Sequence, residues 1–122
     1  MRKYAIISNN SKYKKIMIAK LVSDYLIFLY DSDEDVFSIV SKRYSSNEAL
    51  NNYINTIDGD IQEWIEIDDP LEFCNYDLII PSRLFGRDKE KPNADGLWER
   101  YVDNEWRLYL LGDDGSWKKI SD

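Results

Sequence analysis

One segment of this chain, residues 45–59, has the apolar spacing of an amphipathic α-helix, whereas most other apolar segments are short runs of β-branched and aromatic residues. Four apolar residues of the segment recur at i, i+3, i+4 and i+7 and would form one stripe on a helix: Leu50, Tyr53, Ile54 and Ile57. Ser45 is the expected N-cap because Glu48 follows it at capping-box spacing, and Gly59 is the expected C-terminal cap. The sequence therefore predicts one main helix over about residues 46–58.

The segments before this helix have the composition of β-strands. The first candidate is residues 3–8, and residues 15–22 and 25–30 are separated by a Ser-Asp pair that predicts a hairpin. Residues 25–30, YLIFLY, are apolar on both faces, as is typical of a central strand. Residues 36–44 are rich in β-branched and aromatic side chains and are expected to add a third strand to this meander.

The segments after the helix also favour strands. In residues 61–67, alternation predicts that Ile61, Ile65 and Ile67 point one way and Gln62, Trp64 and Glu66 the other. Residues 97–102, 105–111 and 116–120 are expected to form a C-terminal three-stranded meander joined by tight turns. The predicted fold class is α+β, with a mostly antiparallel, twisted sheet and one main helix, in a single domain over residues 1–122.

Length and composition fit a folded chain. The 122 residues are enough to bury a core, and 43% hydrophobic residues with 14% aromatics exclude a disordered tail. The single cysteine, Cys74, cannot form an internal disulfide. The basic start has too short an apolar run for a signal peptide, and the longest apolar run, residues 25–30, is too short to span a bilayer. A cytoplasmic protein without membrane contact is expected.

The sequence contains no motif that predicts a reaction. Histidine is absent, which removes the commonest general base and zinc ligand, and no glycine-rich phosphate loop is present. The adjacent carboxylates Asp68-Asp69 and Asp113-Asp114 lie in turn sequences, where Asp is favoured for backbone hydrogen bonding. We therefore expect no enzymatic activity and no cofactor, although a carboxylate-based enzyme remains an alternative.

The acidic stretch at residues 31–35 resembles a calcium-binding loop at first sight. Asp31, Asp33 and Asp35 alternate as EF-hand ligands do. Counting from Asp31, however, position six is Val36 instead of glycine and position twelve is Lys42 instead of glutamate. No metal site is predicted, and the stretch is expected to be a turn between strands.

The charges of the chain are strongly segregated. The formal net charge is −7, but residues 1–20 contain six basic side chains and no acidic one, whereas residues 44–82 contain nine acidic side chains and no Lys or Arg. Nucleic acid would be repelled by most of this surface, so direct nucleic-acid binding is not expected. A basic protein partner, attracted by the acidic window, is predicted; the alternative is that the charge serves solubility alone.

The acidic window contains one tryptophan, Trp64, which would be a good anchor for a basic partner if it were exposed among the carboxylates. The alternative is that Trp64 packs under the loop after Pro70. The predicted contact residues are Asp60, Glu63, Trp64, Glu66, Asp68 and Asp69, with Asp31, Asp33, Glu34 and Asp35 as a second patch.

This small, acidic, aromatic-rich α+β profile resembles the immunity proteins that bacteria make against polymorphic or contact-dependent toxins. The resemblance extends over the whole chain, and neither GDDGSWKKI nor DSDED assigns it to a named immunity family. It implies a cytoplasmic inhibitor that binds and blocks one cognate basic toxin, such as a nuclease, through acidic surface. A structural or assembly subunit is a further alternative, and a phage-encoded inhibitor of a host nuclease would use the same physics.

Overall fold

The computed structural model of the chain describes residues 2–32, 38–67, 83–84, 97–102, 105–111 and 116–120. Its elements in chain order are β1 (Arg2–Ser8), β2 (Lys15–Lys20), β3 (Tyr25–Tyr30), β4 (Val40–Tyr44), α1 (Asn47–Ile54), β5 (Asp60–Ile61), β6 (Ile65–Ile67), β7 (Arg83–Leu84), β8 (Leu97–Val102), β9 (Glu105–Leu111) and β10 (Trp117–Lys119). Each strand pairing among these elements is antiparallel. The predicted α+β class is confirmed.

The strands form two sheets. In the main sheet the order is β4-β3-β2-β1, and β5 and β6 both pair with the remaining side of β1. The second sheet has the order β10-β9-β8-β7, so the predicted C-terminal meander is confirmed and gains one short strand. The YLIFLY strand β3 lies between β2 and β4, which confirms its predicted central position.

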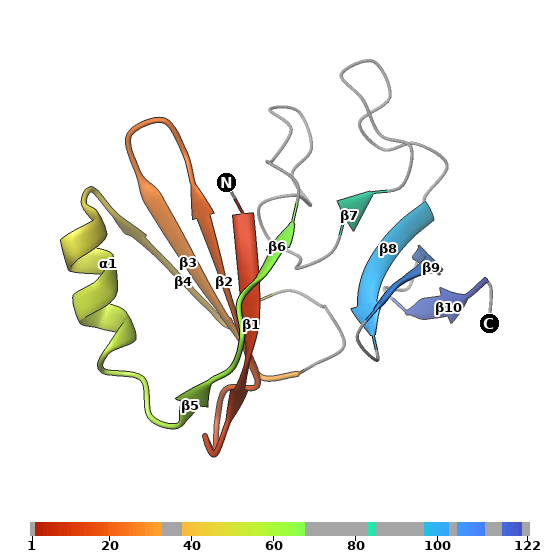
Figure 1. Cartoon of the computed structure of the whole chain (residues 1–122), viewed down its shortest axis with the longest axis horizontal. Coiled ribbons are helices and arrows are strands. Elements are labelled where there is room, and N and C mark those ends of the chain that lie inside the picture. The colour runs from red at the N-terminus through yellow and green to blue at the C-terminus, as the bar shows by residue number, and fades with distance from the viewer. Residues whose placement is uncertain are drawn as a thin grey trace.

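The main sheet is buried on both faces, and different elements cover each face. Side chains of one face pack with Leu50 of α1 in a first core cluster: Ala5, Ile7, Ile16, Ile18, Ile27 and Leu29. The opposite face supplies a second cluster, against which Tyr101 and Trp106 of the C-terminal sheet pack: Tyr4, Met17, Ala19, Phe28, Tyr30 and Ile67. Figure 1 accordingly shows α1 and β8–β10 on opposite sides of the main sheet.

Helix α1 is shorter than predicted, and its N-cap is one residue later. Ser46 has extended backbone angles, and its Oγ accepts a hydrogen bond from the backbone N–H of Ala49 at 3.1 Å. Glu48 is therefore at the second helical position, so the predicted capping box at Ser45 is wrong. The predicted apolar stripe is confirmed, because Leu50 is buried and its three partners pack against the first cluster.

The helix also ends earlier than predicted, at Ile54 with Asn55 as C-cap. The next backbone bonds, from Thr56 to Tyr53 and from Ile57 to Ile54, span three residues and tighten the last turn. The hydroxyl of Thr56 also donates to the Tyr53 carbonyl at 2.6 Å. These bonds satisfy carbonyls at the helix end, so no glycine cap is needed there.

Gly59, the predicted cap, has a different function in the chain. Its φ of +96° is in the left-handed region, and a Cβ built on it would lie 2.4 Å from the Ser8 carbonyl oxygen. This glycine lets the segment before β5 approach the end of β1 closely. Asn10 can then donate its side-chain N–H to the Asp58 carbonyl at 2.7 Å.

Two predicted strands differ from the structure by more than two residues. The segment 61–67 is not continuous, because residues 62–64 separate β5 from β6. Ile61 consequently packs in the cluster on the α1 side, whereas Ile65 and Ile67 pack on the opposite face, so the prediction that all three share a face is wrong. The strand expected over residues 36–44 begins at Val40 in the described part of the chain.

No helix within the described residues is long and apolar enough to cross a membrane.

Candidate functional site

Four carboxylates are exposed along the segment that borders β1: Asp58, Asp60, Glu63 and Glu66. We call this set the acidic edge; it extends from the loop before β5 to the middle of β6 (Figure 1). Within the part of the chain that the structure describes, no Lys or Arg forms an ion pair with any of the four. Four negative charges are therefore exposed along this segment.

Hydrogen bonds to β1 and the turn after it hold the acidic edge in place. Asn9, which itself adopts a positive φ of 60°, donates its side-chain N–H to the Asp60 carboxylate at 2.8 Å. The backbone N–H of Gln62 donates to the Ile6 carbonyl at 2.9 Å, and its side-chain amide donates to the Ser8 hydroxyl at 3.1 Å. Because these bonds fix residues 60–62, the carboxylates project from an ordered backbone.

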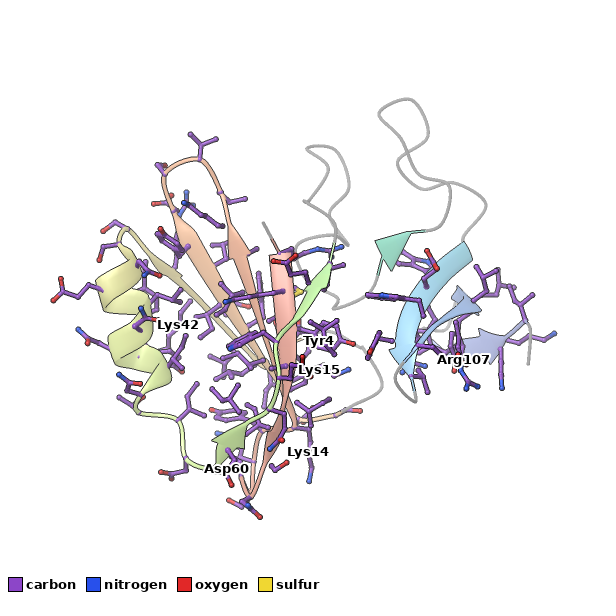
Figure 2. The ribbon with its side chains drawn as sticks, in the orientation of Figure 1. Tyr4, Lys14, Lys15, Lys42, Asp60 and Arg107 are labelled. Carbon is purple, nitrogen blue, oxygen red and sulfur yellow. The ribbon has the colours of Figure 1, made fainter. Side chains whose placement is uncertain are left out.

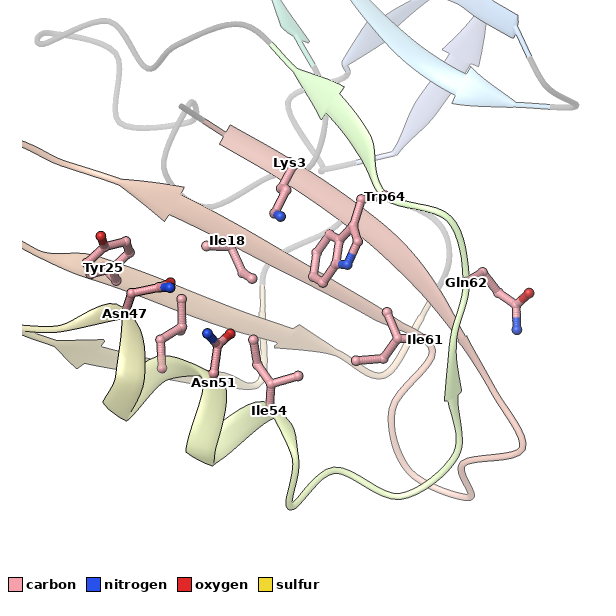
Figure 3. A pocket seen from close by; sticks show the side chains of 10 residues that line it. Lys3, Ile18, Tyr25, Asn47, Asn51, Ile54, Ile61, Gln62 and Trp64 are labelled. Atoms are coloured by element: carbon pink, nitrogen blue, oxygen red, sulfur yellow. The ribbon is translucent and has the colours of Figure 1, made fainter.

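Trp64 is half-buried and packs against the first core cluster. The ammonium group of Lys3 lies 4.6 Å from the centroid of the indole ring, within cation–π range. Figure 3 shows the indole as one wall of a cavity of about 300 Å³ between α1 and the sheet, with Asn47 and Asn51 of α1 on the other side. The chain itself thus supplies a cation to the tryptophan that was predicted to anchor a partner.

Glu66 lies opposite Lys3 in the pairing of β1 with β6. Paired residues of an antiparallel ladder share a face, so Glu66 and Lys3 both lie on the α1 side of the sheet. Trp64 packs on that same side. The sequence-based expectation that Trp64 and Glu66 share a face, opposite Ile65 and Ile67, agrees with this geometry.

The structure describes one residue of the second predicted patch, Asp31. Asp31 is exposed directly after β3, whereas Asp33, Glu34 and Asp35 lie outside the described residues, as do Asp68 and Asp69. Backbone bonds join Tyr30 to Lys14 and Lys14 to Ile7, and Ile7 is opposite Ile61. Asp31 therefore lies at the same end of the sheet as β5, but two strands, β2 and β1, separate them. Figure 2 labels Lys14 and Asp60 at this end of the sheet.

A second hollow adjoins the acidic edge on the face away from α1. Its volume is about 630 Å³, and its described lining residues are Ile6, Ser8, Gln62, Glu63, Trp64, Ile65 and Tyr101. Tyr101 comes from β8 of the C-terminal sheet, and its contribution was not predicted from the sequence. The alternation of residues 97–102 predicts a strand, but it carries no signal for which part of the main sheet that strand approaches.

Comparisons of the chain with models of known protein families, with curated proteins and with solved structures find no match.

Proposed function

We propose that this protein is a cytoplasmic inhibitor of the immunity type, which binds a basic protein such as a toxin nuclease and blocks it through the acidic edge. The observation that carries the proposal is the acidic edge itself: four exposed carboxylates on one ordered segment, without an ion-pair partner in the described residues. The surrounding window, residues 44–82, contains no Lys or Arg.

Electrostatics supports this function in two ways. Charges of one sign on one segment attract a basic partner from a distance and raise the association rate at low salt. On contact, the carboxylates can accept charge-assisted hydrogen bonds from lysine and arginine side chains that otherwise bind phosphate. Occupation of those side chains would exclude a nucleic-acid substrate.

The ordered backbone of the acidic edge is the second support. Hydrogen bonds from Asn9 and Gln62 fix this segment. Its carboxylates therefore lose less conformational freedom on binding than carboxylates on a flexible loop would. The Lys3–Trp64 contact joins the same segment to the core. The surface is therefore already arranged before a partner arrives.

The test uses the toxin domain encoded beside this gene, or a panel of purified basic nuclease domains if no such neighbour exists. Binding and nuclease inhibition are measured at several salt concentrations for the wild-type chain and for Glu63→Gln/Glu66→Gln. We expect the double variant to bind roughly tenfold or more weakly at low salt and to lose part of the salt dependence.

The control is Glu48→Gln, which removes an exposed carboxylate from α1, away from the acidic edge; Glu105 is unsuitable because its carboxylate pairs with Arg107 at 2.7 Å. At about 0.1 M salt it should bind within about twofold of wild type, because charges beyond the corresponding Debye length of about 10 Å are largely screened. Equal loss in both variants would mean that net charge alone matters. Absence of binding to every basic domain tested would overturn the proposed function.

A further inference from the structure

The hollow beside the acidic edge combines exposed apolar surface with a carboxylate. It arises because residues 62–64 leave the regular ladder between β5 and β6. On this face of β1, Tyr4 is 1% exposed under the C-terminal sheet, but Ile6, two residues on, is 38% exposed. An isoleucine is thus open to solvent at the floor of a hollow of about 630 Å³.

The walls of the hollow differ in chemistry. Ile65 extends the apolar floor, and Tyr101 supplies an aromatic ring that is held edge-on by Trp106, with 5.4 Å between ring centroids and 72° between planes. Among the described lining residues, Glu63 is the charged one. Its side chain is exposed and forms no ion pair within the described part of the chain.

This combination fits one kind of side chain. An arginine has an apolar stem that buries well against aliphatic surface and a planar cation that pairs with a carboxylate and stacks on an aromatic ring. A neutral apolar side chain would leave the Glu63 carboxylate without a cation, and an acidic side chain would be repelled by Glu63. Arginine is also among the residues most enriched at interface hot spots.

We propose that this hollow receives an arginine side chain of the basic partner, with its stem over Ile6 and Ile65 and its guanidinium group between Glu63 and Tyr101. The inference rests on the proposed function and names the anchor of that interface. Trp64, one of the contact residues predicted from the sequence, lines the wall of the hollow instead of anchoring the partner, because its ring is engaged with Lys3.

The test is an NMR titration of the full chain with Nα-acetyl-arginine N-methylamide, followed through backbone amide signals. We expect saturable shifts centred on Ile6, Glu63, Ile65 and Tyr101. The citrulline analogue has nearly the same shape without the charge and should bind at least about fivefold more weakly, as should the arginine probe to Glu63→Gln. Glu48→Gln is the control and should bind the probe as wild type does.

Two outcomes would overturn the inference. One is a set of shifts spread evenly over all exposed carboxylates, and the other is unchanged probe affinity in both Glu63→Gln and Ile6→Ser. The inference fails separately from the proposed function. If a basic partner needs Glu66 for binding but tolerates Glu63→Gln and Ile6→Ser, the arginine site in the hollow is refuted and the inhibitor function is retained. Conversely, saturable binding of the arginine probe without inhibition of any basic domain would support an arginine site in the hollow and refute the proposed inhibitor function.

Discussion

The ammonium group of Lys3 lies 4.6 Å from the centroid of the Trp64 indole, and this contact joins the N-terminal strand to the acidic edge. Lys3 is the second residue of β1, whereas Trp64 lies in the interruption between β5 and β6. The tryptophan also packs against the first core cluster, so it connects the carboxylates around it to the interior. A tryptophan in this position supports the acidic edge from beneath.

The first prediction concerns the energy of this contact. Trp64→Leu should lower the free energy of unfolding by about 1–3 kcal/mol, because a half-buried indole loses much of its packing. Lys3→Met should cost about 0.5–1 kcal/mol in the wild-type background and close to nothing beside Trp64→Leu, because the cation–π interaction is then already absent. Urea unfolding of the four chains measures the coupling. Lys14→Met, a change at an exposed lysine, is the control, and equal effects of Lys3→Met in both backgrounds would contradict the contact.

The second prediction separates two adjacent serines. Ser46→Ala should lower the free energy of unfolding by about 1 kcal/mol, because the Ala49 N–H loses its side-chain acceptor. Ser45→Ala, one residue earlier and also exposed, should change it by less than about 0.5 kcal/mol. Thermal or urea unfolding of both variants makes the comparison. A larger effect at Ser45 would restore the capping box inferred from the sequence.

The third prediction concerns Gly59. Gly59→Ala should destabilise the fold by about 1–3 kcal/mol, because alanine resists a φ of +96° and its Cβ would meet the Ser8 carbonyl oxygen. Asp58→Ala is the neighbouring control, since only the backbone carbonyl of Asp58 accepts the Asn10 hydrogen bond. Hydrogen exchange should show the loss first at residues 60–62. A Gly59→Ala chain as stable as wild type would contradict the close approach to β1.

The fourth prediction is a pH dependence. Burial raises the pKa of Tyr53 above its ordinary value of 10.0, and the nearby Tyr13 and Tyr44 raise it further. The folded-state pKa therefore exceeds the unfolded one, so the contribution of Tyr53 to stability is complete below about pH 10 and is lost as the pH rises through the folded-state pKa. The stability difference between wild type and Tyr53→Phe should stay constant at neutral pH and shift against wild type in alkaline solution. Parallel profiles of the two chains up to strongly alkaline pH would refute the shift.

Much of the secondary structure was predictable because its signals are local. The stripe formed by Leu50, Tyr53 and Ile54 follows from helical periodicity, and the central position of β3 follows from apolar residues on both faces. The choice between Ser45 and Ser46 was not predictable, because both are good N-caps and the decision depends on where the preceding strand β4 ends. Local sequence also gave no signal for the tightened turn that ends α1 at Ile54.

The candidate site shows the same division. The run of carboxylates and the absence of Lys and Arg over residues 44–82 can be read from the sequence, and they predict an acidic surface. Strict alternation, however, placed Ile61 with Ile65, and the interruption at residues 62–64 reversed that relationship. The interruption depends on bonds from Gln62 to Ile6 and Ser8, which are distant in sequence and invisible to local patterns.

The sequence by itself determined the α+β class, the apolar stripe of the helix and the segregation of charge, since each depends on residue type and spacing over a few positions. Tertiary structure alone decided that Lys3 engages Trp64 and that Tyr101 lines the same hollow as Ile6 and Glu63. These residues are tens of positions apart in the sequence. They come together when α1 packs on one face of the main sheet and the C-terminal sheet packs on the other. Hydrophobic burial drives this packing, but the effect is non-directional. The topology of the chain therefore sets which side chains meet.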